Sequence, residues 1–244
     1  MKQKQRIALF GMVAVALIFA ACGGDSGNNT SSSSVGVSSS SLVVSSLNVT
    51  LSSSSFIEYG SLTYGEQTYK TVTYTYGSQT YKTVTIGTQT WMVENLNYAD
   101  SASTTNLKGN SWCYEDRADN CVKYGRLYTS TGAMNLASSY QSASASAVIS
   151  TLQQGVCPTG WHIPTNAEWT TLKIAVGGSS TAGTALKSAS GWSSNGNGTD
   201  TYGFSTLPAG YRNLDGSFGV VGDYANFWSA TEGGTGSAYD LYLG

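Results

Sequence analysis

Charged residues are scarce in this chain. Only 11% of its 244 residues are Asp, Glu, Lys or Arg, against about 25% in an average protein. The formal net charge is -2, and no basic stripe is present that could neutralise a phosphate backbone. Nucleic-acid binding is therefore excluded. Because Gly, Ser, Thr, Tyr and Asn are abundant, we expect a neutral, hydrogen-bonding surface.

Histidine is almost absent. His162 is the single histidine, so a Ser-His-Asp triad or a multi-histidine metal site has only one imidazole available. It lies between Trp161 and Ile163, in a strand that leads to a helix start. This context favours a structural, hydrogen-bonded histidine over a catalytic base.

The apolar run at the amino terminus is too short to cross a bilayer. It covers the 15 residues 7–21, whereas a spanning helix needs about 20. Basic residues precede it at Lys2, Lys4 and Arg6. This pattern predicts a signal peptide over residues 1–21.

The end of this segment resembles a bacterial lipobox. The stretch 19–24 reads Phe-Ala-Ala-Cys-Gly-Gly, which implies cleavage before Cys22 and lipid attachment to that cysteine. Phe19 departs from the Leu usually found there, and a simple secretory signal is the alternative. Gly23 favours an outer-membrane or cell-surface protein by resemblance to enterobacterial sorting. The acyl chains would then anchor the protein to the membrane.

The residues after Cys22 have linker composition. Serine dominates residues 25–55, and such a stretch cannot bury enough apolar surface to offset the entropy of ordering. We therefore expect a disordered, flexible tether over residues 22–57. The rest, residues 58–244, is long enough for one domain with its own core.

A tandem repeat opens this domain. Residues 64–74 recur as residues 76–86, and a shortened echo follows at 87–91. Alternating Tyr, Thr and Val with Gly at the breaks is typical of strands and turns, so we expect a hairpin or meander. The first copy is predicted to be a duplicated or added edge strand, on which Lys70 and Lys82 would discourage edge-to-edge association.

A capped helix follows in the second half of the domain. Thr165 and Glu168 have the spacing of a capping box, and Gly177-Gly178 supplies a left-handed stop. Apolar residues share one face at Trp169, Leu172 and Val176. The pattern predicts an amphipathic helix over about residues 166–176.

Six motifs in order resemble the Fibrobacter succinogenes major paralogous domain over residues 65–244. They cover residues 91–98, 112–121, 123–128, 157–172, 203–212 and 227–232. Within them, the Pro-Thr-x-Ala-Glu-Trp core at 164–169 is also similar to the formylglycine-generating and sulfatase-modifying family. The resemblance implies an α+β fold, a C-type lectin-like domain with short helices, antiparallel strands and long loops.

The chemistry of these relatives does not transfer. Formylglycine-generating enzymes use a late cysteine pair, and no cysteine follows Cys157 here, so that mechanism is excluded. C-type lectins bind calcium and sugar through Glu-Pro-Asn or Gln-Pro-Asp with Trp-Asn-Asp, and none of these strings occurs. Phe227-Trp228-Ser229 occupies the comparable strand without acidic ligands.

The cysteines point to one local disulfide. An exported chain favours disulfides over zinc, and the spacing of Cys113, Cys121 and Cys157 matches no zinc finger. We expect Cys113 to pair with Cys121. With Cys22 lipidated, Cys157 is then left alone. Because related domains usually continue to a final cysteine, this predicts a chain truncated at Gly244.

Two groups of residues are candidates for ligand binding. Calcium is a possible ligand of the acidic loop, with a solvated loop offset by Arg117 as the alternative; its residues are Glu115, Asp116, Asp119 and Asn120. Loop aromatics could stack on sugars, with ordinary packing as the alternative; they are Trp192, Tyr202, Tyr211, Tyr224 and Tyr239. The remaining aromatics of the motifs are assigned to the core: Trp91, Trp161, Trp169 and Trp228.

The sequence therefore predicts a non-catalytic, lipid-anchored binding or adhesion module of the cell envelope. Polysaccharide or an envelope protein is its expected partner, besides the membrane itself. One alternative is an enzyme related to the sulfatase-modifying family. Another is a structural envelope protein without a soluble ligand.

Overall fold

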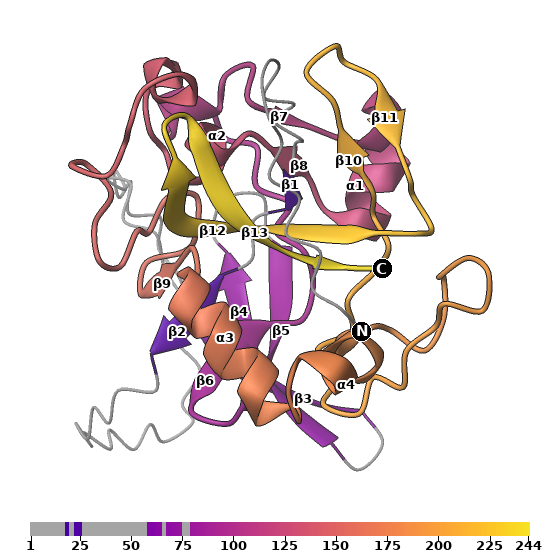
Figure 1. The fold of residues 1–244 in the computed structure, drawn as a ribbon. Coiled ribbons are helices and arrows are strands. Elements are labelled where there is room, and N and C mark those ends of the chain that lie inside the picture. The colour runs from indigo at the N-terminus through magenta and orange to yellow at the C-terminus, as the bar shows by residue number, and fades with distance from the viewer. Residues whose placement is uncertain (1–17, 20–21, 26–57, 65–66, 75–78) are drawn as a thin grey trace, which may run out of the picture.

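The protein has a mixed α+β fold with short helices and small, mainly antiparallel sheets (Figure 1). The structure is a computed structural model that describes residues 18–19, 22–25, 58–64, 67–74 and 79–244. Most of the predicted signal peptide and linker lie outside these ranges. Within them, no helix is both long enough and apolar enough to cross a membrane.

One sheet has six strands in the order β3-β4-β5-β6-β2-β9, all antiparallel to their neighbours. The strands are β3 (Glu58–Tyr64), β4 (Gln67–Tyr74), β5 (Gln79–Ile86), β6 (Gln89–Met92), β2 (Gly23–Asp25) and β9 (Trp161–His162). The repeat thus forms the predicted meander. Its first copy, β4, lies between β3 and β5 rather than at the edge, because residues 58–64 add a further strand.

The second sheet has five strands in the order β13-β12-β1-β8-β7. They are β13 (Ser237–Leu243), β12 (Ala225–Gly234), β1 (Ile18–Phe19), β8 (Leu127–Tyr128) and β7 (Ser111–Trp112). Only the contact between β1 and β12 is parallel. A separate ribbon pairs β10 (Tyr211–Arg212) with β11 (Phe218–Gly219). Short strands of the amino-terminal segment therefore enter both large sheets.

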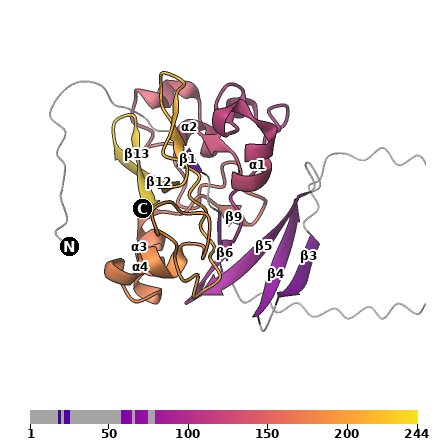
Figure 2. The same cartoon turned by 90° about the vertical axis from the view of Figure 1, so that its right-hand side faces the viewer.

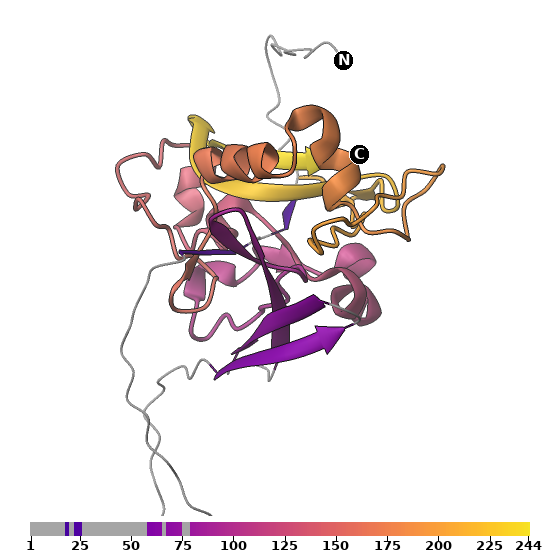
Figure 3. The ribbon, with the colours of Figure 1, turned by 90° about the horizontal axis from the view of Figure 1, so that it is seen from below.

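The helices are all short. They are α1 (Ala118–Tyr124), α2 (Ser130–Ala133), α3 (Asn166–Ala175) and α4 (Ser179–Leu186), with 3₁₀ turns at Thr105–Leu107, Tyr114–Asp116 and Ser138–Gln141. Helix α3 packs against β12 and β13, and Figure 3 shows α3 and α4 alongside this hairpin. Long irregular segments connect these elements.

Helix α3 begins and ends where the sequence predicts. Thr165 Oγ1 accepts a hydrogen bond from Glu168 N–H, and the Glu168 carboxylate accepts one from Thr165 N–H, which completes the capping box. The chain leaves the helix through Gly177 and Gly178, whose φ angles are 96° and 93°. These positive angles are readily adopted only by glycine.

The predicted core tryptophans are all buried. The rings of Trp91 and Trp169 stack with centroids 4.8 Å apart. Their cluster also contains Leu172 of α3, Phe227 of β12, and Leu241 and Leu243 of β13. Trp161 and Trp228 belong to a second cluster. Trp228 Nε1 donates to the Tyr128 carbonyl at 2.9 Å, so the polar edge of this indole is also satisfied.

Two disulfides join the four cysteines. The predicted Cys113–Cys121 bond is present. Cys157 is bonded to Cys22, so the prediction of an unpaired Cys157 is wrong. The prediction assumes a lipidated Cys22, whereas residues 23–25 form β2 beside β9 and bring the Cys22 sulfur to Cys157. The rest of the linker lies outside the described residues, and lipidation of Cys22 stays a prediction.

The cap provides a test of local stability. We expect Thr165→Ala to lower the free energy of unfolding by about 1 kcal/mol, because it removes one side of the capping box. Thr170→Ala is the matched control. Thr170 is exposed and bonds only to the Asn166 carbonyl, so its loss should change stability by no more than about 0.5 kcal/mol. Denaturant titration followed by tryptophan fluorescence measures both, and equal effects would contradict the role of the cap.

Candidate functional site

Trp192 is not available as a surface platform. Its side chain is only 7% exposed. The indole Nε1 donates to Ser188 Oγ at 3.0 Å and to the Thr206 carbonyl at 3.2 Å, and Lys187 Nζ lies 4.4 Å from the ring centroid. Trp192 is therefore a core residue, which corrects its assignment as a sugar-stacking aromatic.

The other loop aromatics differ in exposure. Tyr202 is half-buried and packs against the first core cluster. Tyr211 is half-buried in β10, whereas Tyr224 is 41% and Tyr239 48% exposed. Tyr211 lies in the β10–β11 ribbon, Tyr224 directly before β12, and Tyr239 in β13. Only Tyr224 and Tyr239 are open enough to stack on a ligand.

The acidic side chains of the predicted calcium loop are not gathered together. Glu115, Asp116 and Asp119 are exposed, and among the described residues no group of three or more His, Cys, Asp or Glu side chains is placed to hold a metal ion. The Asn120 side chain donates to the Tyr114 carbonyl at 2.8 Å and so supports the loop from within. This arrangement therefore does not support the calcium hypothesis, which stays a prediction.

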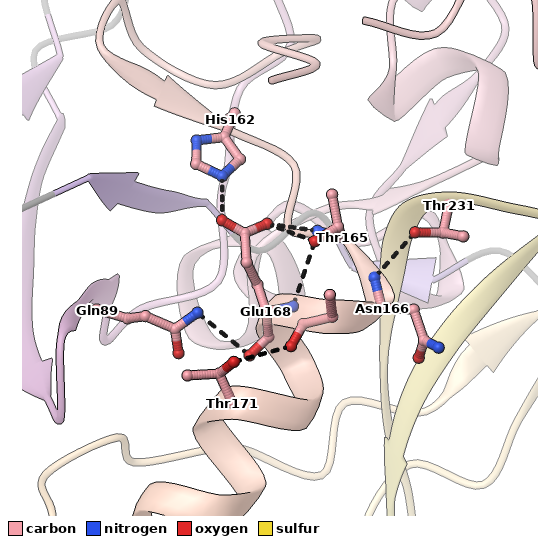
Figure 4. A network of polar contacts seen from close by, with 8 residues as sticks. Gln89, His162, Thr165, Asn166, Glu168, Thr171 and Thr231 are labelled. Carbon is pink, nitrogen blue, oxygen red and sulfur yellow. Dashed lines mark hydrogen bonds and ion pairs between the residues drawn. The ribbon is translucent and has the colours of Figure 1, made fainter. Parts of the chain in front are cut away.

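His162 has the structural role that its context predicts. It is buried, and its Nε2 lies 2.7 Å from Glu168 Oε1 (Figure 4). Burial alone would raise the pKa of Glu168, but hydrogen bonds from His162 and Thr165 outweigh it, so the pKa is below its usual value. The hydroxyl that joins this pair is that of Thr165, whose Oγ1 donates to Glu168 Oε2 at 2.9 Å as part of the helix cap (Figure 4).

A cavity of about 420 Å³ lies beside β5. This volume is within the range of about 300–1,000 Å³ that is typical of small-molecule sites. It is lined by residues from four parts of the chain. They lie in residues 79–82 of β5, 93–97 after β6 and 121–125 in and after α1, together with Ser188, Ser205 and Leu207. Figure 2 shows α1 and β5 on the same side of the molecule.

The polar wall of the cavity is built on Lys82 and Glu94. Lys82 N–H donates to Glu94 Oε2 at 2.7 Å, and Lys82 Nζ lies 3.7 Å from Glu94 Oε1. Burial raises the pKa of Glu94, although these contacts with Lys82 oppose the shift. A carboxylate with this perturbation in a cavity is a typical mark of a functional site.

Tyr81 is a buried residue of the cavity lining, next to Lys82. Burial raises its pKa to about 12, against the hydrogen bond from Asn97 N–H. The hydroxyl donates to Gln79 Oε1 at 2.5 Å. The half-buried side-chain amide of Asn97 makes no hydrogen bond to another described residue, which leaves it free to bind a ligand.

The remaining walls are apolar or weakly polar. Val93, Val122 and Leu207 contribute aliphatic surface, and Val122 is 83% exposed. A second cavity beside Glu232 measures only about 20 Å³, which is room for about one water. The cavity beside β5 is therefore our candidate site, and it offers hydrogen bonds and apolar contact to a small, neutral ligand.

The sequence did not single out this site. Its pattern marks Lys82 only as a charge on a predicted edge strand, and Glu94 and Asn97 only as parts of the motif at residues 91–98. One signal was present in residues 91–98, where polar residues interrupt an otherwise apolar run.

The sequence model of the Fibrobacter succinogenes major domain matches residues 84–244. The chain belongs to this family. The match begins within β5, so it includes the cavity-lining residues from Val93 onward and none of the lining residues 79–82. No curated protein and no solved structure matches the chain.

The Glu168 pair predicts a pH dependence. Because the pKa of Glu168 is lowered from its usual 4.5 in the folded state, its contribution to stability is present above pH 4.5 and is lost as pH falls through the folded-state pKa. We expect Glu168→Gln to flatten this part of the pH profile. Denaturant unfolding at several acidic pH values measures it. A variant profile parallel to that of the wild type would contradict the assignment, and Glu115→Gln, at an exposed position, is the control.

Proposed function

We propose that this protein is a non-catalytic, lipid-anchored binding module of the bacterial cell envelope that takes a neutral polysaccharide segment in the cavity beside β5. The observation that carries the proposal is the cavity itself, which combines the Asn97 side-chain amide, without a hydrogen bond to another described residue, with a neutralised Lys82–Glu94 pair. Sugars are bound by such sets of donors and acceptors beside apolar surface.

The anchor is proposed from the sequence. A signal peptide over residues 1–21, a lipobox-like cysteine at position 22 and a serine-rich stretch together favour an outer-membrane or cell-surface location. Acyl chains on one cysteine are enough for stable attachment. The domain would then meet its ligand outside the cell.

We also propose that the α+β domain is C-type lectin-like. Short helices, antiparallel strands and long irregular segments support this finer class. Its sugar binding would not use calcium in the manner of C-type lectins, because the chain has none of their ligand strings. Binding therefore depends on hydrogen bonds from the cavity.

The proposal also favours a binding module over an enzyme. The single histidine is committed to Glu168, and both disulfides use the cysteines that would serve as nucleophiles. A structural envelope protein remains the alternative that the following experiment separates.

We expect Asn97→Ala to weaken polysaccharide binding about 5-fold, because it removes a hydrogen bond worth about 1 kcal/mol. Retardation of the full chain, in detergent, on native gels that contain soluble plant or cell-wall polysaccharides measures the affinity. Asn166→Ala is the control, since Asn166 is exposed at the start of α3 and away from the cavity lining.

Equal retardation of Asn97→Ala and wild type would remove the cavity from the proposal. No retardation by any polysaccharide, with recovery of a stoichiometric protein partner from membranes, would instead support a structural envelope protein.

A further inference from the structure

Cys22 is a candidate for two different modifications, lipid attachment and disulfide formation. Its position at the end of the predicted signal peptide is that of a lipid-bearing cysteine, but in the structure its sulfur is bonded to Cys157. We propose that Cys22 is a branch point in maturation: in each molecule it either receives lipid or bonds to Cys157, and the disulfide withholds the membrane anchor. This inference rests on the lipid anchor of the proposed function, but not on its ligand.

The two fates exclude each other because they use the same sulfur. In lipidation, the Cys22 thiol gives up its proton and bonds to the diacylglyceryl carbon of phosphatidylglycerol, while the carbon–oxygen bond to the headgroup breaks and glycerol phosphate leaves with the proton. In oxidation, Cys22 and Cys157 lose two protons and two electrons to the disulfide of a thiol oxidoreductase, which becomes a dithiol. A thioether sulfur cannot take the second route.

Burial makes the choice persistent. Cys22 and Cys157 are each 1% exposed, in the core cluster that also contains Leu96, Trp161 and Ile163. A membrane enzyme that transfers lipid needs an accessible thiol. Once Cys22 is packed in this cluster, its sulfur is out of reach of such an enzyme.

The backbone around Cys22 is held on both sides. Strand β2 lies between β6 and β9, with Gly23 opposite Trp91 on one side and His162 on the other. Met92 N–H donates to the Cys22 carbonyl at 3.3 Å. Acyl chains cannot occupy this position between two strands, so lipidation requires that Cys22 stay outside the sheet.

The residues before the predicted cleavage site are also part of the fold. Strand β1 pairs with β8 and β12, with Phe19 opposite both Leu127 and Phe227. Cleavage before Cys22 would remove β1 from this sheet. The disulfide-bonded form therefore keeps strands on both sides of the cleavage site, and a signal peptidase must act before these strands pair.

The branch decides whether residues 22–57 can act as a tether. In the lipidated form, their first residue is in the membrane and their last leads into the domain. In the bonded form, Cys22 is fixed to Cys157 within the domain. In that form β2 and β3, at the two ends of this stretch, belong to the same six-stranded sheet, so residues 22–57 no longer separate the domain from a membrane.

The test is to express the full chain in a bacterium with a lipoprotein pathway and to analyse the Cys22 and Cys157 peptides by mass spectrometry after thiol alkylation. We expect two wild-type populations, one lipidated with an alkylated Cys157 and one unlipidated with the Cys22–Cys157 bond. Cys157→Ser should lose the unlipidated population. Cys113→Ser is the matched control, because it breaks the other disulfide and should leave the lipidated fraction unchanged.

Two results would overturn the branch point. One is a lipidated fraction that is equal in wild type and Cys157→Ser. The other is a Cys157 that is not alkylated in the lipidated wild type. That result would show that the Cys157 sulfur is bonded to a group other than Cys22. Because both measurements score peptides, they hold even if a variant folds poorly. Absence of lipid from every variant would overturn the anchor as well, and polysaccharide binding by the domain would be unaffected.

Discussion

The amino terminus of α3 is the point at which the helix and both sheets are joined. The Glu168 carboxylate completes the capping box and contacts His162 of β9, while the Glu168 carbonyl accepts a hydrogen bond from the Gln89 side chain of β6. Asn166 N–H donates to Thr231 Oγ1 of β12. These hydrogen bonds satisfy polar groups at the helix start. They also fix α3 against both sheets, in the orientation in which Trp169 is buried.

Local signals explain what could be predicted from the sequence. The cap, the spacing of Trp169 and Leu172 and the glycine stop all lie within 14 residues, 165–178, so the bounds of α3 were correct. Long-range pairing was beyond such signals. Cys22 and Cys157 are 135 residues apart, and no periodicity marks residues 23–25 as a strand. Trp192 sits in a glycine-rich loop, and its indole is buried because it packs in the first core cluster, where Ser188 Oγ and the Thr206 carbonyl accept its N–H.

The cavity beside β5 shows the same limit. Its walls come from four segments, and only the fold brings Lys82 near Glu94. The scarcity of charge nevertheless agrees with what the site contains. Lys82 and Glu94 neutralise each other, and burial raises the pKa of the Tyr81 hydroxyl further above neutral pH, to about 12. A site of this kind selects its ligand by the placement of hydrogen bonds and shape, and electrostatic steering contributes little.

The Cys113–Cys121 bond lies at one wall of this cavity. Cys121 lies in α1, next to Val122 on the cavity wall. Arg126 Nη1 lies 3.5 Å from both sulfurs of the bond, and Arg126 N–H donates to the Leu96 carbonyl at 2.9 Å. An isolated helix as short as α1 is not stable in water. The disulfide and Arg126 therefore hold α1 against the segment after β6, and through α1 they position one wall of the cavity.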